Sequence, residues 1–148
     1  MTVFNSDITG VLHPAATASQ AGVVLSNIAE ANLPTTLAAT DIVKLNKLPA
    51  GHRPVDFQVE TEILDSGAGI AISFGVLNAA GDDLVANTNF LTDDTTAQTG
   101  GVARADVIDG LGLAESDSDR IIAAKVTTVA GTAVAGALRS KLLYCENG

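Results

Sequence analysis

Residues 55–63 alternate apolar or small side chains with polar ones, without a break. One set of alternate positions holds Val55, Phe57, Val59, Thr61 and Ile63, and the other holds Asp56, Gln58, Glu60 and Glu62. A period of two is typical of a half-buried strand, because successive side chains of a strand point to opposite sides of the sheet. The segment therefore predicts a strand with one face on a core and the other in water.

A second segment with the same period follows a turn. Asp65-Ser66-Gly67-Ala68-Gly69 favours a chain reversal, and residues 70–76 then carry Ile, Ile, Phe and Val at alternate positions. We expect residues 55–64 and 70–77 to form an antiparallel hairpin that carries much of the core.

Several further strands are expected between turn signals. The candidate strands are residues 21–28, 41–48, 84–91, 120–129 and 137–145, with 49–54 as a corner and 92–96 as a loop. Residues 97–114 favour a short helix or a long irregular connection, since four glycines oppose a long helix. Seven or so short strands predict an all-β fold of the β-sandwich type. Aromatic residues make up only 3% of the chain, so Val, Ile, Leu and Ala must fill the core.

The first 20 residues show no periodicity, which predicts an extended N-terminal arm over residues 1–20 and a single β-sandwich domain over residues 21–148. Arms of this kind either stay loose or dock on a neighbouring chain. The apolar side chains of Val3, Phe4, Val11 and Leu12 are the candidate contacts with a partner.

The charge balance argues against two classes of partner. The chain has 17 acidic and 8 basic residues, for a net charge of −9, and the basic residues are scattered singly. Nucleic acids and anionic membranes are bound by clustered Lys and Arg, so neither is expected as a partner. No apolar run approaches the ~18 residues of a membrane span, and no secretory segment is recognisable. We expect a protein made in the cytoplasm, with a single cysteine, Cys145, and no internal disulfide.

Asp65-Ser66-Gly67 resembles the catalytic turn of aspartic peptidases, whose retroviral-type members bring one such turn from each subunit of a homodimer. That chemistry needs two carboxylates that share a proton. The apolar-apolar-Gly element of those enzymes is matched poorly by Ile108-Asp109-Gly110. Asp, Ser and Gly are also common turn residues, so we interpret Asp65 as a turn residue and keep the homodimeric aspartic peptidase as a distant alternative.

No metal or cofactor site is predicted. Glu115, Asp117 and Asp119 have the spacing of a calcium loop, but Arg120 replaces the required Gly and Val126 the final Glu. The two histidines, His13 and His52, lie near neither Cys145 nor an acidic residue at ligand spacing. We expect no catalytic residue, no cofactor and no enzyme activity. A surface cation held between two acidic loops stays open as an alternative.

Five segments resemble small structural proteins of tailed bacteriophages, of the head-decoration or cement type. These are residues 48–57 (LPAGHRPVDF), 75–78 (GVLN), 98–101 (QTGG), 118–120 (SDR) and 142–144 (LLY), and the resemblance runs over roughly residues 20–145. It implies a β-sandwich or jelly roll, a homotrimer, and a place on the outer capsid surface of the virion with the major capsid protein as partner. It brings no catalytic residues.

Three functions are therefore weighed. A virion decoration protein that stabilises the head lattice is favoured. A β-sandwich that binds receptors or carbohydrates in a phage tail comes second, and it is weakened by the absence of Trp and the single Tyr, because sugars stack on aromatic rings. The aspartic peptidase comes third.

Overall fold

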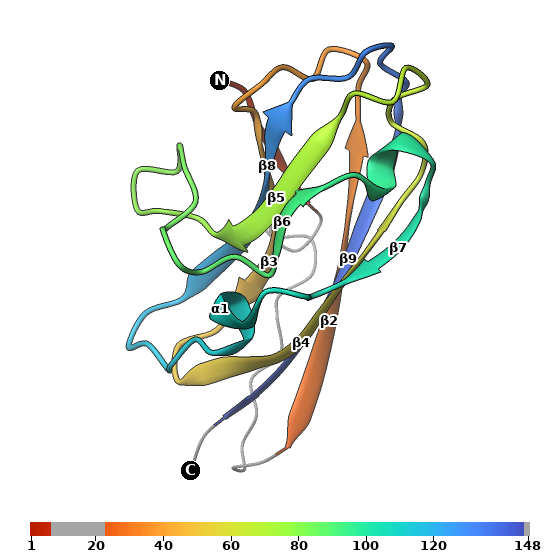
Figure 1. Cartoon of the computed structure of the whole chain (residues 1–148). Helices are drawn as coiled ribbons and strands as arrows, with labels where there is room; N and C mark the ends of the chain where they lie inside the picture. The colour runs from red at the N-terminus through yellow and green to blue at the C-terminus, as the bar shows by residue number, and fades with distance from the viewer. Residues whose placement is uncertain (7–22, 147–148) are drawn as a thin grey trace.

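The computed structural model describes residues 1–6 and 23–146, which form two β-sheets packed face to face (Figure 1). The first sheet has the strand order β1 (Val3–Asn5), β3 (Ile42–Leu48), β8 (Arg120–Thr128), β5 (Ala71–Val76) and β6 (Leu91–Asp94). The second has the order β2 (Val24–Leu33), β9 (Gly136–Glu146), β4 (His52–Thr61) and β7 (Gly101–Arg104). A 3-10 turn, η1 (Thr96–Gln98), and one short helix, α1 (Ile108–Leu111), complete the elements. The predicted all-β sandwich is confirmed.

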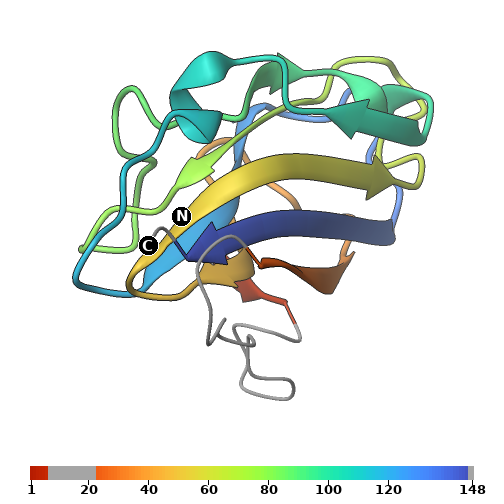
Figure 2. The same ribbon diagram turned by 90° about the horizontal axis from the view of Figure 1, so that it is seen from below.

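The core lies between the two sheets, which Figure 2 shows from below with β4 and β9 side by side. Phe57 of β4 meets Phe74 of β5 and Phe90 of the following loop, with ring centroids 5.8 and 4.9 Å apart. Aliphatic side chains fill the rest, including Val43, Leu45, Leu48, Val59, Ile72, Ile122, Leu138 and Leu142. Three phenylalanines, Tyr144 and many aliphatic side chains thus fill the core.

The predicted hairpin of residues 55–64 and 70–77 is wrong. β4 pairs with β9 and β7, whereas β5 pairs with β8 and β6 in the opposite sheet. The turn at Asp65 therefore carries the chain across the sandwich instead of back along one sheet. A period of two shows that a segment is a strand but does not determine which strand lies beside it.

The predicted buried face of β4 is correct only in its middle. Phe57, Val59 and Thr61 are buried, but Val55 and Ile63 are 44% and 48% exposed. A register shift between Pro54 and Asp56 marks a bulge, which moves the side chains before it to the other face. Ile63 lies beyond the end of the strand at Thr61.

All six residues of β5 are buried, and a loop covers the strand at Gly75 and Val76. The loop side chain of Thr88 accepts a hydrogen bond from the Val76 N–H (3.1 Å) and donates one to the Val85 carbonyl (2.7 Å). A Cβ on Gly75 would lie 2.7 Å from Oδ1 of Asn89, so the loop approaches the strand closely there. This loop occupies most of residues 84–91, which we expected to be a strand; β6 instead forms at residues 91–94, in the expected loop.

The first residues belong to a sheet. β1 pairs in parallel with β3, and the Thr2 N–H donates to Oδ1 of Asp41 (2.6 Å). The first strand expected from the sequence began at residue 21, so β1 was missed, because three residues are too few for a period to be recognised. Residues 7–20 of the predicted arm lie outside the described residues, and the division into arm and domain stays a prediction.

A buried polar network ties the two sheets together at the β2 and β3 side. Nδ2 of Asn46 on β3 donates to Oδ1 of Asn27 on β2 (2.5 Å), and Oγ of Ser140 on β9 donates to Oδ1 of Asn46 (2.6 Å). Nδ2 of Asn27 in turn donates to the Lys47 carbonyl (2.9 Å). These side chains are buried, so their mutual bonds replace those lost to water.

Candidate functional site

The Asp65 carboxylate is fully buried and surrounded by backbone N–H groups. Its Oδ1 accepts hydrogen bonds from Gly67 (2.7 Å) and Thr132 (2.8 Å), and its Oδ2 accepts from Gly69 (2.5 Å), Ile70 (2.8 Å) and Gly131 (2.8 Å). The Asp65 side chain thus binds two connections that lie far apart in the sequence. One leads from β4 to β5, and the other leads from β8 to β9. We call residues 65–70 the Asp65 turn.

The electrostatics of this carboxylate are those of a structural anchor. Burial alone raises the pKa of Asp65, but the hydrogen bonds from Thr132, Gly131, Gly69 and Gly67 outweigh it and hold the pKa well below its ordinary value of 3.8. An aspartic peptidase needs a carboxylate that shares a proton with a second one, at a surface that a substrate reaches. The buried Asp65 has neither property, so its geometry supports the turn and not the peptidase.

Two of the other candidates, Asp119 and His52, also have structural contacts, whereas His13 lies outside the described residues. Asp119 pairs with Nζ of Lys47 (2.6 Å) and accepts the Ala50 N–H (2.9 Å). The His52 ring bonds the Ala50 carbonyl (2.9 Å) and packs edge-on against Tyr144, as expected for its corner. Over residues 1–6 and 23–146, no three His, Cys, Asp or Glu side chains gather closely enough to hold a metal ion.

Two of the four predicted contact residues lie in the described part. Val3 and Phe4 are half-buried in β1, and Phe4 packs against the edge of the core. Val11 and Leu12 lie outside the described residues. The role of all four in binding a partner stays a prediction.

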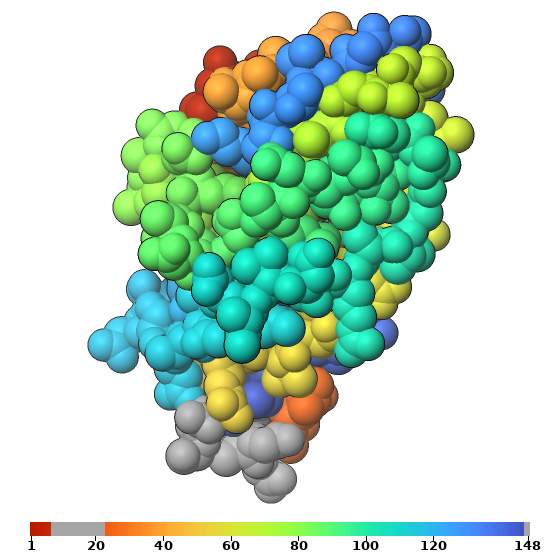
Figure 3. Space-filling view, in the orientation of Figure 1, coloured from red at the N-terminus to blue at the C-terminus, as the bar shows by residue number. Residues whose placement is uncertain are grey.

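A pocket of about 560 Å³, which no sequence motif predicted, lies at the end of the sandwich. Val76 and Leu77 of β5, Val85 and Thr88 of the covering loop, Leu113 after α1, and Arg120 and Ile121 of β8 form much of its lining. In Figure 3 the surface is hollowed between the green lobe around residues 78–90 and the light-blue lobe around residues 113–120. We call this hollow the Arg120 pocket.

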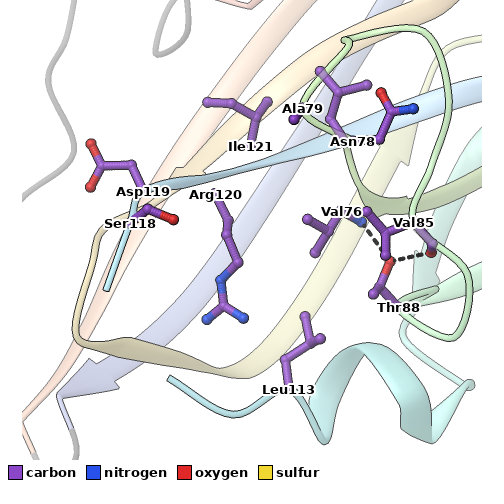
Figure 4. A pocket seen from close by; sticks show the side chains of 11 residues that line it. Val76, Asn78, Ala79, Val85, Thr88, Leu113, Ser118, Asp119, Arg120 and Ile121 are labelled. Carbon is purple, nitrogen blue, oxygen red and sulfur yellow. Dashed lines mark hydrogen bonds between the residues drawn. The ribbon is translucent and has the colours of Figure 1, made fainter. Parts of the chain in front are cut away.

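Arg120 extends into the pocket toward Leu113, while the Asp119 carboxylate points the other way (Figure 4). The guanidinium Nη2 donates to the His52 carbonyl (3.0 Å), but the buried Nε has no hydrogen-bond partner. Arg120 forms no salt bridge with any described residue, and burial lowers the pKa of its guanidinium. The pocket thus contains one positively charged side chain, that of Arg120. Its Nε has no hydrogen-bond partner, and aliphatic side chains make up much of the lining around it.

The sequence contained only a weak signal for this pocket. Arg120 stands as a single basic residue between an acidic turn and an apolar strand. The same pattern occurs at the start of many exposed strands. Only the covering loop and the segment after α1, which the sequence does not place, turn this position into a pocket wall.

No helix among the residues that the structure describes is long and apolar enough to cross a membrane.

Comparison with known proteins gives a fold and not a family. No protein-family model matches the chain, and no curated protein matches its sequence significantly. Among solved structures, a chain from the capsid of Ralstonia phage GP4 superposes with a TM-score of 0.89, covering 99% of both chains at 23% sequence identity. A chain from the capsid asymmetric unit of cyanophage Pam1 gives a TM-score of 0.68, covering 90% of this chain and 91% of that chain at 22% identity. The protein therefore has the fold of chains found in two phage capsids.

Proposed function

We propose that this protein is a structural component of a phage virion, and specifically a decoration protein that binds the outer surface of the head. The observation that carries the proposal is the end-to-end match to a chain of the Ralstonia phage GP4 capsid, which covers 99% of each chain. A match of that extent involves both sheets of the sandwich and not one local motif. The saturated Asp65 carboxylate is consistent with this non-enzymatic role.

The proposed partners are the major capsid protein and further copies of this chain, in a homotrimer. A specific interface typically buries ~1,200–2,000 Å². We propose that the N-terminal segment adds contact area through Val11 and Leu12, with Val3 and Phe4 at its base. Binding late to an assembled shell, such a protein would stabilise the lattice by bridging neighbouring capsomers. It would be made in the host cytoplasm and need neither cofactor nor nucleic acid.

Particles that lack the protein test this proposal directly. Purified protein is mixed with such particles, and the bound fraction is measured by co-sedimentation and located by electron microscopy. We expect binding to the outside of the head, weakened when Val11 and Leu12 are both replaced by Ser. The control replaces Val129, which is exposed at the end of β8, by Ser. Density on the tail instead would favour the receptor-binding alternative, and absence from particles altogether would contradict the proposal.

A further inference from the structure

The tip of helix α1 presents an unusual combination of side chains. Ile108 is 81% exposed, the highest value among the large hydrophobic residues of the described part, and the side chain of its neighbour Asp109 is exposed and forms no hydrogen bond or ion pair with the described residues. An isoleucine so exposed lacks the favourable free energy of burial, and a partner that covered it would gain that free energy. We call Ile108 and Asp109 the α1 tip.

The α1 tip is held firmly in place. The Gly110 N–H donates to the Asn89 carbonyl (2.8 Å), and a Cβ on Gly110 would lie 2.7 Å from the Phe90 ring. Helix and core are therefore in direct contact, with Phe90 fully buried beneath. A rigid tip loses little conformational entropy when it docks, which favours binding.

The Arg120 pocket has the complementary properties. Six of its eleven lining residues are aliphatic and suit an isoleucine, and the Arg120 guanidinium lacks a carboxylate partner. Asp119, the acidic residue in the lining, is already paired with Lys47. An apolar side chain beside one carboxylate is the ligand that such a pocket selects.

We propose that the α1 tip of one copy docks in the Arg120 pocket of a second copy. Ile108 packs between Val85 and Leu113, and the Asp109 carboxylate accepts hydrogen bonds from the Arg120 guanidinium. The tip and the pocket are neighbours, because Leu113 of the pocket lining follows α1 by two residues (Figure 4), and each copy offers both. Such a head-to-tail contact closes into a ring when the rotation between copies allows it. The inference rests on the proposed homotrimer, for which it supplies the interface.

A second copy fits the pocket better than a small polyanion does. Phosphate groups are bound by several donors or cations together, whereas this pocket offers one guanidinium on a molecule of net charge −9. One tip alone buries too little area for a stable oligomer, so the flanking loops must also take part. The tip and pocket then act as the central contact of a wider interface, where single residues matter most.

The test is the dissociation constant of self-association, measured by sedimentation equilibrium over a range of concentrations. Ile108→Ser and Asp109→Asn change exposed side chains, so both variants are expected to fold like the parent chain. Each should weaken association at least about tenfold. The matched controls are Val102→Ser, at a residue that is 57% exposed on β7, and Asp106→Asn, at another exposed acidic residue. Both should leave association unchanged.

A charge exchange tests the pairing itself. Asp109→Arg and Arg120→Glu should each weaken association, and a mixture of the two variants should associate more tightly than either alone, because the arginine tip of one then meets the glutamate pocket of the other. Arg120 also bonds the His52 carbonyl, so thermal unfolding must first show that its variant is folded. If it is not, the result with Ile108→Ser decides.

Three outcomes would overturn the inference: a monomer at every concentration, equal effects of Ile108→Ser and Val102→Ser, or no effect of either tip variant. If Ile108→Ser weakens particle binding but leaves self-association unchanged, the α1 tip contacts another protein of the particle and not a second copy of this chain. That result would also overturn the inference. Ile108-dependent association of a protein that does not bind particles would uphold the inference and reject the proposed function.

Discussion

At the scale of single residues, Asp65 shows how a motif with a chemical resemblance becomes structural. Asp-Ser-Gly after an apolar strand suits both a catalytic turn and an ordinary one. The environment of the carboxylate separates the two. Five backbone N–H groups donate hydrogen bonds to the two carboxylate oxygens and keep the carboxylate ionised. These bonds fix the segment in which the chain passes from one sheet to the other.

Asp65→Asn is expected to lower the thermal midpoint markedly at pH 7, because the amide Nδ2 would face N–H donors and no negative charge would remain. The folded-state pKa of Asp65 lies below its unfolded value, so the wild type has this stabilisation above pH ~4 and loses it as the pH falls further. The difference between variant and wild type should therefore shrink from pH 7 toward pH ~2.

Thermal unfolding of both proteins across this pH range checks the prediction. Asp106→Asn is the matched control, since Asp106 is exposed. A variant as stable as wild type at pH 7 would show that the N–H cluster contributes nothing.

At the scale of elements, the sequence predicted strands better than their pairing. Residues 41–48, 120–129 and 137–145 form β3, β8 and β9 nearly as expected, and Pro34 ends β2. The pairing of β4 with β9 and of β5 with β8 depends on contacts between distant segments, which a local period does not encode. Strand β6 has the sequence Leu-Thr-Asp-Asp, and its pairing with β5 overrides the loop preference of the two aspartates.

Asn46→Ala is expected to cost about 2–4 kcal/mol of unfolding free energy, because Asn27 and Ser140 would each lose a partner while buried. Chemical denaturation measures the loss. Asn32→Ala, at an exposed asparagine on β2, should change stability by less than about 0.5 kcal/mol. Equal effects of the two substitutions would mean that the network does not hold the sheets together.

Removing residues 1–6 should leave a folded sandwich with a thermal midpoint roughly 2–8 °C lower. The loss follows from the parallel pairing of β1 with β3 and from the Thr2 to Asp41 hydrogen bond. Differential scanning calorimetry gives the midpoint, and the Val11→Ser, Leu12→Ser double variant is the comparison, expected to melt like wild type. An unchanged midpoint after truncation would show that β1 adds no stability.

At the scale of the whole molecule, the fold class followed from the sequence and the candidate binding surface did not. Strand periods and low aromatic content suffice for a two-sheet sandwich. The Arg120 pocket is built from β5, β8, the covering loop and the segment after α1, and no period or motif marks these as neighbours. Ile108, in a glycine-rich stretch, carried no sign that it would be exposed.

The net charge of −9 gives a prediction for the molecule as a whole. Copies repel one another, and salt screens that repulsion over a Debye length of ~10 Å at 0.1 M. Self-association should therefore strengthen as NaCl rises from about 0.02 M to about 0.3 M, because an enclosed Asp109–Arg120 pair is screened less than the exposed charges. Sedimentation equilibrium at both salt concentrations measures it, and weaker association in high salt would contradict this balance of charges.

The buried carboxylate of Asp65 also has a consequence for the rates of folding and unfolding. Its partners Gly131 and Thr132 lie 66 and 67 residues further along the chain, so the cluster cannot form until distant segments have met. Interactions completed after the transition state slow unfolding without speeding folding. Asp65 would then act chiefly by slowing unfolding, so that the folded chain opens spontaneously only rarely and its lifetime is set by a rate.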